Sequence, residues 1–221
     1  MAALGGAAGA TQHAGPGQDD DETPATHASV AQWQAWAEHD LDQARRYDWA
    51  ADSAARGCTL LEIEFTTEVD PGYNAAMGAP AGLSTVRVDR VEECGEPTAE
   101  MKDSTSTQAR TASVPRGTRC NYGTRGPGTI CLSSSGSWIT ASWQNRGSAA
   151  TTGFLRIYRI PTNASHCPTG TTWHTGAQTT WSSGQTRSIS KAQTQNGAYS
   201  AHIWRQNVVG HSNWGGTCAR F

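Results

Sequence analysis

The last 118 residues of this 221-residue chain contain no aspartate or glutamate. Asp103 is the last acidic residue, so residues 104–221 carry 11 basic side chains and a formal charge of +11. Residues 1–103 hold all 19 acidic side chains and 6 basic ones, a formal charge of -13. Paired carboxylates for glycoside hydrolysis or acid–base catalysis therefore cannot come from residues 104–221 alone.

Other signals are also missing. No apolar run approaches the ~18 residues of a membrane span. There is no G-x-S-x-G nucleophile elbow, no Gly-Lys-Ser/Thr phosphate loop and no His-Glu-x-x-His sequence. Phenylalanine is scarce, with 3 residues against 9 tryptophans, so tryptophan carries an unusual share of the apolar volume. These absences predict no catalytic residues, no cofactor and no membrane span.

Six cysteines are present, and none form a C-x-x-C pair, which excludes zinc-ribbon and thioredoxin-like interpretations. Their even number favours disulfides, although six buried free thiols are the alternative. Chain order favours three bridges, which are Cys58–Cys94, Cys120–Cys131 and Cys167–Cys218. Disulfides indicate an oxidising compartment, and the small apolar residues ending in Ala8-Gly-Ala10 are typical of the tail of a signal peptide. We therefore expect a secreted, extracellular protein.

The pattern along the chain divides it into four parts. Residues 1–28 read as a signal remnant and a disordered acidic leader, and residues 96–118 as a polar linker. Residues 29–95 predict one helix of about 25 residues starting at Ser29, followed by a disulfide-closed hairpin. The hairpin strands span 58–69 and 85–91, with apolar residues from Leu61 to Val69 on the buried face and a Gly/Ala loop over 72–83 between them.

Residues 119–221 predict a basic, antiparallel β-sandwich. Its expected strands are 129–133, 137–144, 153–160, 171–174, 177–181, 186–190, 198–205 and 215–220. The fold class is thus mainly β, with the sandwich preceded by a long α-helix and a β-hairpin.

Tryptophans provide two candidate binding sites. Trp138, Trp143 and Trp181 lie in a Ser/Thr-rich β framework, where exposed rings would stack on sugars; the alternative is that they build the core. Trp33, Trp36 and Trp49 lie on the acidic helix and are candidates for a protein interface, because Trp is frequent among interface hot spots. Burial of this helix against the chain's own β part is the alternative.

Three histidines of the β part, His174, His202 and His211, could in principle bind zinc. Residues 104–221 offer no carboxylate to orient them, so we expect surface histidines and no metal site. The +11 charge would suit contact with phosphates, but the same part lacks a carboxylate base, so action on nucleic acid is not expected.

The segments Cys120…Cys131, Trp138-Ile-Thr-Ala-Ser-Trp143 and Trp204-Arg…Trp214-Gly-Gly-Thr-Cys218 resemble small, disulfide-bridged β proteins exported by actinomycetes. The two-part organisation is also similar to the adaptor subunit of umbrella toxin particles, which joins a lectin-bearing subunit to a toxin-bearing stalk. No functional residues are carried over from either resemblance.

These observations favour a secreted, non-enzymatic adaptor that binds other secreted proteins, in line with a subunit of an extracellular antibacterial toxin complex. One alternative is a small secreted hydrolase or toxin whose acidic half is a pro-region, released by cleavage near Thr105–Arg119. The other alternative is a carbohydrate-binding module.

Overall fold

The computed structural model describes residues 23–95, 114, 116–122, 126–193 and 196–221. The predicted leader and linker lie mostly outside these residues. Residues 23–28 are described and lie against the folded part, where Ala28 packs on the main core. None of the helices in the described ranges is long and apolar enough to cross a membrane.

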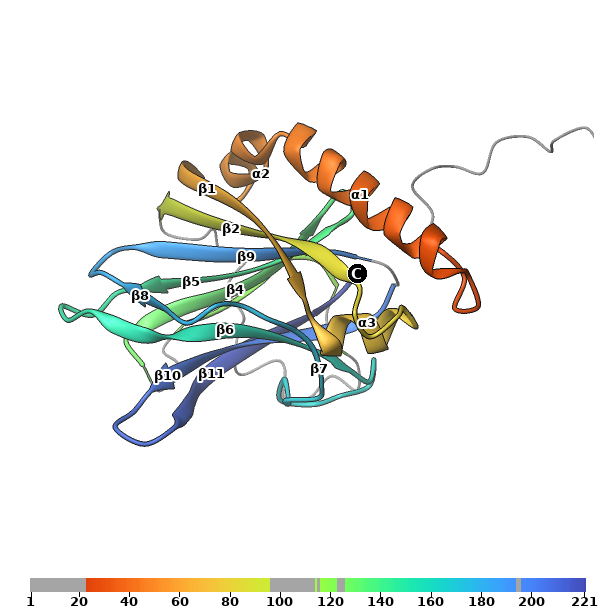
Figure 1. Ribbon diagram of the computed structural model, residues 1–221. Coiled ribbons are helices and arrows are strands. Elements are labelled where there is room, and N and C mark those ends of the chain that lie inside the picture. The colour runs from red at the N-terminus through yellow and green to blue at the C-terminus, as the bar shows by residue number, and fades with distance from the viewer. Residues whose placement is uncertain (1–22, 96–113, 115, 123–125, 194–195) are drawn as a thin grey trace, which may run out of the picture.

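Two antiparallel sheets make up most of the molecule (Figure 1). Sheet A has the strand order β1-β2-β9-β5-β4-β3, and sheet B has the order β11-β10-β6-β7, with β8 also paired to β6. The strands are β1 Cys58–Val69, β2 Ser84–Cys94, β3 Arg119–Tyr122, β4 Gly128–Ser135, β5 Trp138–Asn145, β6 Thr151–Ile160, β7 Thr171–Thr175, β8 Thr179–Trp181, β9 Thr186–Ala192, β10 Ala198–Gln206 and β11 His211–Arg220. All eight strands expected after residue 119 are present, and β3 is an additional one.

The main core lies between the two sheets. Sheet A contributes Ile130, Leu132, Ile139 and Trp143, and sheet B contributes apolar side chains that include Leu155, Ile157, Tyr199 and Ile203. Side chains along each strand alternate between the two faces of its sheet, and β5 and β9 are buried along most of their length on both faces. This arrangement agrees with a mainly β fold of two packed sheets.

The helical segment is not one long helix, contrary to the sequence expectation. It comprises α1 Val30–Arg46 and α2 Trp49–Ala55. Tyr47 adopts an extended conformation, and the side chain of Asp48 accepts a hydrogen bond from Ala51 N at 2.9 Å, which starts a new helix. Apolar spacing continues across the junction because both helices bury the same side, so periodicity alone did not reveal the break.

The two helices cover the outer face of sheet A (Figure 1). Ala44 and Trp49 pack there against Val86, Val88 and Trp138. The capping box predicted at Ser29 is present, with Gln32 as its partner. The molecule is therefore built as three layers, which are helices, sheet A and sheet B.

A third helix, α3 Pro71–Met77, replaces the expected Gly/Ala loop. Asp70 caps its N-terminus by accepting from Gly72 N and Tyr73 N, Pro71 occupies the first turn, and Gly78 ends it in the left-handed region at φ 73°. These are ordinary start and stop signals for a short helix. The helix places Tyr73 and Met77 in the main core.

The predicted hairpin forms, with β1 paired to β2 from Cys58↔Cys94 to Val69↔Ser84 and a β-bulge at Leu61 that shifts the register by one residue. Its apolar face is not fully buried, however, because β1 is an edge strand. Leu61, Ile63 and Val69 expose 56%, 37% and 50% of their surface. The acidic face of β1 instead lies on the side of β2 that carries Arg87 and Asp89.

Strand β2 also pairs with β9, from Val88↔Ser190 to Glu92↔Thr186. A single sheet therefore includes strands from both the acidic and the basic half of the chain. The three disulfides are the predicted ones, Cys58–Cys94, Cys120–Cys131 and Cys167–Cys218, and no free cysteine is found in the described part of the chain.

Candidate functional site

The tryptophans proposed for sugar stacking are buried. Trp138, Trp143 and Trp181 expose 3%, 0% and 1% of their surface. Trp143 and Trp181 contact each other edge to face at 5.3 Å inside the main core, and Trp138 lies under the helices, 5.0 Å from Trp49. None of the three rings presents an exposed face for stacking, so the structure corrects this prediction: in a core poor in phenylalanine, these side chains fill volume, and Trp181 reaches a cavity only at its edge.

The helix tryptophans are also directed into the protein. Trp33 and Trp49 are buried, in the main core and against Val88 respectively. Trp36 is half-buried and contacts Trp33 edge to face at 5.8 Å. The prediction of a partner-binding tryptophan stripe is therefore wrong for Trp33 and Trp49, because the chain's own β-sheet covers them.

Two of the predicted surface histidines lie in the interior, His202 of β10 with 5% of its surface exposed and His174 with none. His174 of β7 is fully buried, and its Nδ1 lies 2.8 Å from Oδ2 of Asp70, the residue that caps α3. A β-bulge in the β6–β7 ladder pairs Ile157 with His174 and Tyr158 with Thr172, which leaves Trp173 as the extra residue. Bulges of this kind re-aim side chains. The carboxylate missing from residues 104–221 thus comes from the acidic half.

Burial and this hydrogen bond set the charges of the pair. Burial opposes ionisation of Asp70, but the hydrogen bond and charge of His174 outweigh it and lower the pKa of Asp70 to about 2. Burial lowers the pKa of His174 to about 4, against the raising effect of Asp70. At neutral pH the carboxylate accepts from Nδ1–H, and the Nε2 lone pair of a neutral ring has no partner in the described structure.

A buried lysine lies beside this pair. Lys191 of β9 has its Nζ 4.7 Å from the centre of the Tyr73 ring, with no hydrogen-bond partner among the described residues. Burial lowers its pKa to about 8, while the charges of Glu68, Asp70 and Asp40 act in the opposite direction. Asp40 of α1 is buried as well, and burial raises its pKa to about 7.

Two sets of three side chains come close enough to be considered as metal ligands. In the first, Glu68, Asp70 and His174 place one potential ligand atom each within 4.8 Å of one another, a set suited to a divalent cation. Lys191 and Arg87 already provide positive charge at this position. His202 and His211 are not part of either set found in the described ranges.

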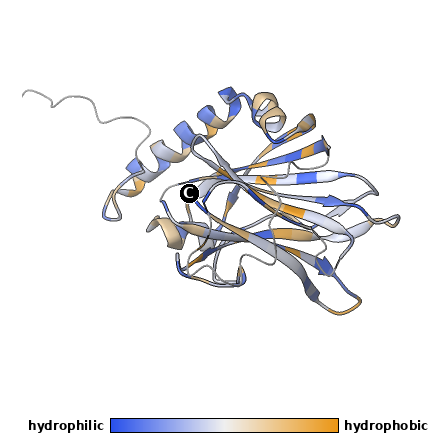
Figure 2. Ribbon diagram, turned by 180° about the vertical axis from the view of Figure 1, so that it is seen from behind, coloured by the Kyte–Doolittle hydropathy of each residue, from blue (hydrophilic) through white to orange (hydrophobic). Residues whose placement is uncertain are grey.

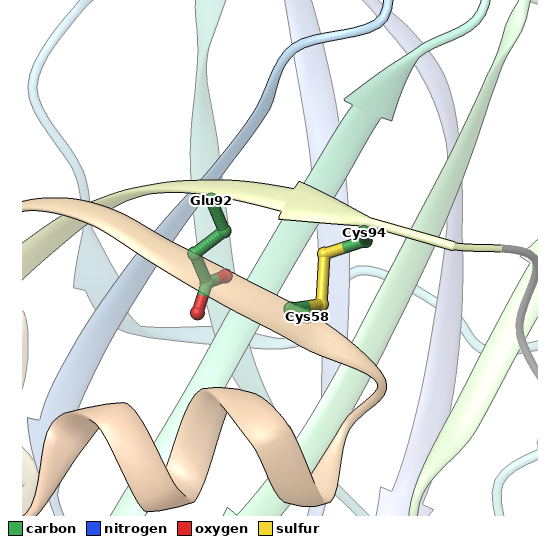
Figure 3. Close-up of side chains that lie close together, drawn as sticks. All are labelled: Cys58, Glu92 and Cys94. Atoms are coloured by element: carbon green, nitrogen blue, oxygen red, sulfur yellow. A yellow bond between two sulfur atoms is a disulfide. The ribbon is translucent and has the colours of Figure 1, made fainter.

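The second set, Cys58, Glu92 and Cys94, is not a ligand set (Figure 3). Figure 3 shows the two sulfurs joined in a disulfide, so no thiolate is available for a metal. Glu92 instead accepts hydrogen bonds from Arg56, Ser53 and Ser188. Its role is to join α2, β2 and β9.

Glu92 belongs to a buried ionic network between α2 and sheet A. Arg90 is 2% exposed, pairs with Asp52, and donates to Thr140 and Ser190 at 3.1 and 3.0 Å. Its guanidinium also lies 4.8 Å from the centre of the Trp49 ring. These arginine–carboxylate pairs join residues of the acidic half to each other, while the contact with the basic half uses hydroxyl groups.

Sequence reasoning overlooked a Ser-x-x-Lys sequence, Ser188 to Lys191. Both residues lie in β9, where positions three apart point to opposite faces of the sheet. Ser188 donates to Glu92 on the helix side, and Lys191 contacts Tyr73. The sequence therefore does not form a Ser–Lys catalytic pair.

A cavity of ≈ 230 Å³ opens between the two sheets. Glu64, Arg87 and Asp89 line it from β1 and β2, Arg187 lines it from β9, and Leu155 and Trp181 line it from β6 and β8. The cavity could not be inferred from the sequence, because its two carboxylates come from strands predicted to belong to a different domain.

The outer face of sheet B carries a partly exposed group of Phe154, Arg156, Trp204 and His211, which we call the sheet-B aromatic face. Trp204 lies opposite Phe154 in the β6–β10 ladder, with nearly parallel rings 6.4 Å apart. His211 contacts Phe154 at 4.9 Å, and the Arg156 guanidinium lies 4.8 Å from the Phe154 ring centre. The hairpin that joins β10 and β11 extends beyond this face.

Comparison of the chain with protein-family models, with curated proteins and with solved structures found no match.

Proposed function

We propose that this protein is a secreted, non-enzymatic interaction protein that binds an acidic protein partner through the β10–β11 hairpin and the sheet-B aromatic face. The single observation that carries the proposal is the exposure of two valines at the hairpin tip. The three disulfides support an extracellular location, because such bridges persist in oxidising compartments.

The hairpin tip is unusually apolar for a solvated turn. Val208 and Val209 expose 103% and 88% of their surface, more than the other large apolar side chains of the described chain. Figure 2 shows this tip as an orange loop projecting from sheet B. Isolated surface valines are common, but two adjacent, almost fully exposed ones at the tip of a hairpin present an apolar surface of the kind that interfaces cover.

The same hairpin strands also contribute Trp204 and His211 to the sheet-B aromatic face. There Arg156 lies against the rings of both Phe154 and Trp204. Aromatic residues and arginine are enriched in interface cores, where they bury much area with little loss of side-chain entropy.

Charge indicates the kind of partner. Residues 104–221, which supply this face, have no acidic side chain, so Arg156 has no carboxylate from its own half of the chain. An acidic surface is the complementary partner, and electrostatic attraction would speed its association. An adaptor role, in which the protein joins two other secreted proteins, remains our working hypothesis for the complete assembly.

The experiment is capture from the culture supernatant of the source organism on immobilised full-length protein. We expect an acidic protein to be retained by the wild type and lost from Val208→Ser/Val209→Ser, with weaker retention as salt rises. Leu61→Ser is the matched control, because Leu61 is also exposed but lies on β1 of sheet A. Equal retention by the hairpin variant and the wild type contradicts the proposal.

The two alternatives have less support. Strand β2 of the acidic half is hydrogen-bonded between β1 and β9, so the acidic half is poorly suited to act as a removable pro-region. A carbohydrate-binding module could not use Trp138, Trp143 and Trp181 as exposed stacking surfaces, because all three are buried.

A further inference from the structure

We propose that the cavity between the two sheets binds a small, uncharged saccharide of one or two rings. This site lies on the other side of sheet B from the aromatic face, with Gln178 of its lining hydrogen-bonded to His211, and it does not depend on the function proposed above. The proposal rests on the cavity itself, on its balanced charges and on its division into polar and apolar walls.

The cavity is of a size for a small ligand. Its ≈ 230 Å³ lies below the ~300–1,000 Å³ of drug-sized sites. A second cavity of ≈ 100 Å³ shares Glu64, Asp89 and Arg187 with it, so a groove continues past these residues along β1 and β2. One ring fits the larger space, and the smaller one can accept part of a second.

The polar wall is fixed by strand register. Glu64 and Asp89 are direct partners in the β1–β2 ladder, so their side chains lie on the same face of sheet A. Arg87 donates from Nε to Oδ2 of Asp89 at 2.7 Å and also pairs with Glu68. The Asp89 carboxylate is thereby held in place, with further acceptor capacity for ligand hydroxyl groups.

The charges of the lining exclude a strongly charged ligand. Two carboxylates, Glu64 and Asp89, face two guanidinium groups, Arg87 and Arg187. Arg90 also lines the cavity, but its charge is paired with Asp52 in the buried network. An anion or a cation would therefore meet a group of its own sign, whereas a neutral ligand with many hydroxyl groups can use both donors and acceptors.

The opposite wall is apolar. Leu155 and Ile189 are buried core residues that reach the cavity, and Trp181 lies beside them. Gln178, just before β8, and Thr179, at its start, add an amide and a hydroxyl group. A surface with an apolar side, carboxylate acceptors and guanidinium donors matches the C–H faces and hydroxyl groups of a sugar.

The test is binding of defined sugars to the purified, disulfide-intact chain, measured by saturation-transfer NMR and calorimetry. The probes are glucose, galactose, mannose, N-acetylglucosamine and their β1,4-linked disaccharides, with glucosamine and glucuronic acid as the cationic and anionic comparisons. We expect at least one neutral probe to bind, and to bind more tightly than both charged probes.

Two variants locate the binding. Asp89→Asn should weaken sugar binding by about tenfold, which is the effect of losing one good polar contact. Glu93→Gln is the control, because Glu93 is an exposed residue of β2 that does not line the cavity, and this variant should bind as tightly as the wild type. Ala177→Trp fills the cavity from an exposed turn without touching the ion pairs, which covers the case in which Asp89→Asn destabilises the fold.

Absence of binding by all neutral probes, preference for a charged probe, or full binding by Ala177→Trp would each overturn the proposal. Protein capture by the hairpin tip is expected to be unaffected in Ala177→Trp. The two proposals can therefore fail separately.

Discussion

Asp40 shows how a single buried carboxylate makes stability depend on pH. Burial raises its pKa to about 7, whereas Lys191 and His39 only partly offset this effect. The folded state therefore binds more protons than the unfolded state between pH ~4 and ~7. The stability that Asp40 contributes is fully present at the acidic end of this window and is lost as pH rises through 7.

Asp40→Asn should remove this pH dependence, because the amide cannot ionise. We expect the variant to gain at least about 1 kcal/mol over the wild type at pH 8 and less at pH 5. Urea unfolding at the two pH values measures the difference. Asp42→Asn, an exposed change on the same helix, should track the wild type, and an equal effect of Asp40→Asn at both pH values would contradict the assignment.

Arg90 is the residue whose removal should be most harmful among the ionic groups. Arg90→Met leaves the buried carboxylates of Asp52 and Glu92 with one cation fewer, and loss of one partner of a buried pair costs about 3–5 kcal/mol. Arg45→Met is the matched control, because Arg45 is exposed and lies 3.8 Å from Asp42 on the surface of α1. Thermal and urea unfolding should separate the two variants clearly, and similar midpoints would refute a structural role for the network.

At the scale of elements, the junction of α1 and α2 depends on one cap. Asp48 accepts from Ala51 N, so Asp48→Ala should cost about 1 kcal/mol in free energy of unfolding. Asp42→Ala makes the same chemical change at a position that caps no helix and forms only surface ion pairs. If the segment were one continuous helix, Asp48→Ala would stabilise the protein, because Ala favours helix interiors.

The same scale explains what sequence patterns could predict. Period-two alternation predicted the strands after residue 119, because those strands alternate between core and outer face. The pattern did not predict which side of β1 faces the interior. As an edge strand, β1 is only partly covered on each of its two faces, and Leu61 remains exposed. The signals for α3, with Asp70, Pro71 and Gly78 in order, were present in the sequence but were interpreted as a loop.

At the scale of the whole molecule, the shared sheet predicts that the two halves hold together without a covalent link. No disulfide joins residues 58–94 to residues 120–218, since the bridges are Cys58–Cys94, Cys120–Cys131 and Cys167–Cys218. After cleavage at a protease site engineered between residues 105 and 112, we expect two fragments that co-elute in native gel filtration. They should separate only in denaturant, because β2 pairs with β9 and Asp70 binds His174.

Elution of the cleaved fragments as separate species would show instead that the halves are independent domains.

High salt should have little effect on the association of the two halves, because the main contacts between them are backbone hydrogen bonds and buried groups, which salt screens weakly. The opposed charges of the two halves are thus not what joins them. The carboxylates of the acidic half pair largely with its own arginines, such as Arg56, Arg87 and Arg90.

The sequence by itself determined the mainly β fold and the positions of most strands, because alternation is a local property, and chain order favoured the observed disulfide pairing without excluding the other pairings. It did not determine which tryptophans are exposed, since a ring in a polar strand is buried or free according to what packs against it. Nor could it place Asp70 against His174, or Glu64 and Asp89 in a cavity walled by Leu155 and Trp181. Those contacts join residues far apart in the chain, and only the pairing of β2 with β9 and the packing of the two sheets bring them together.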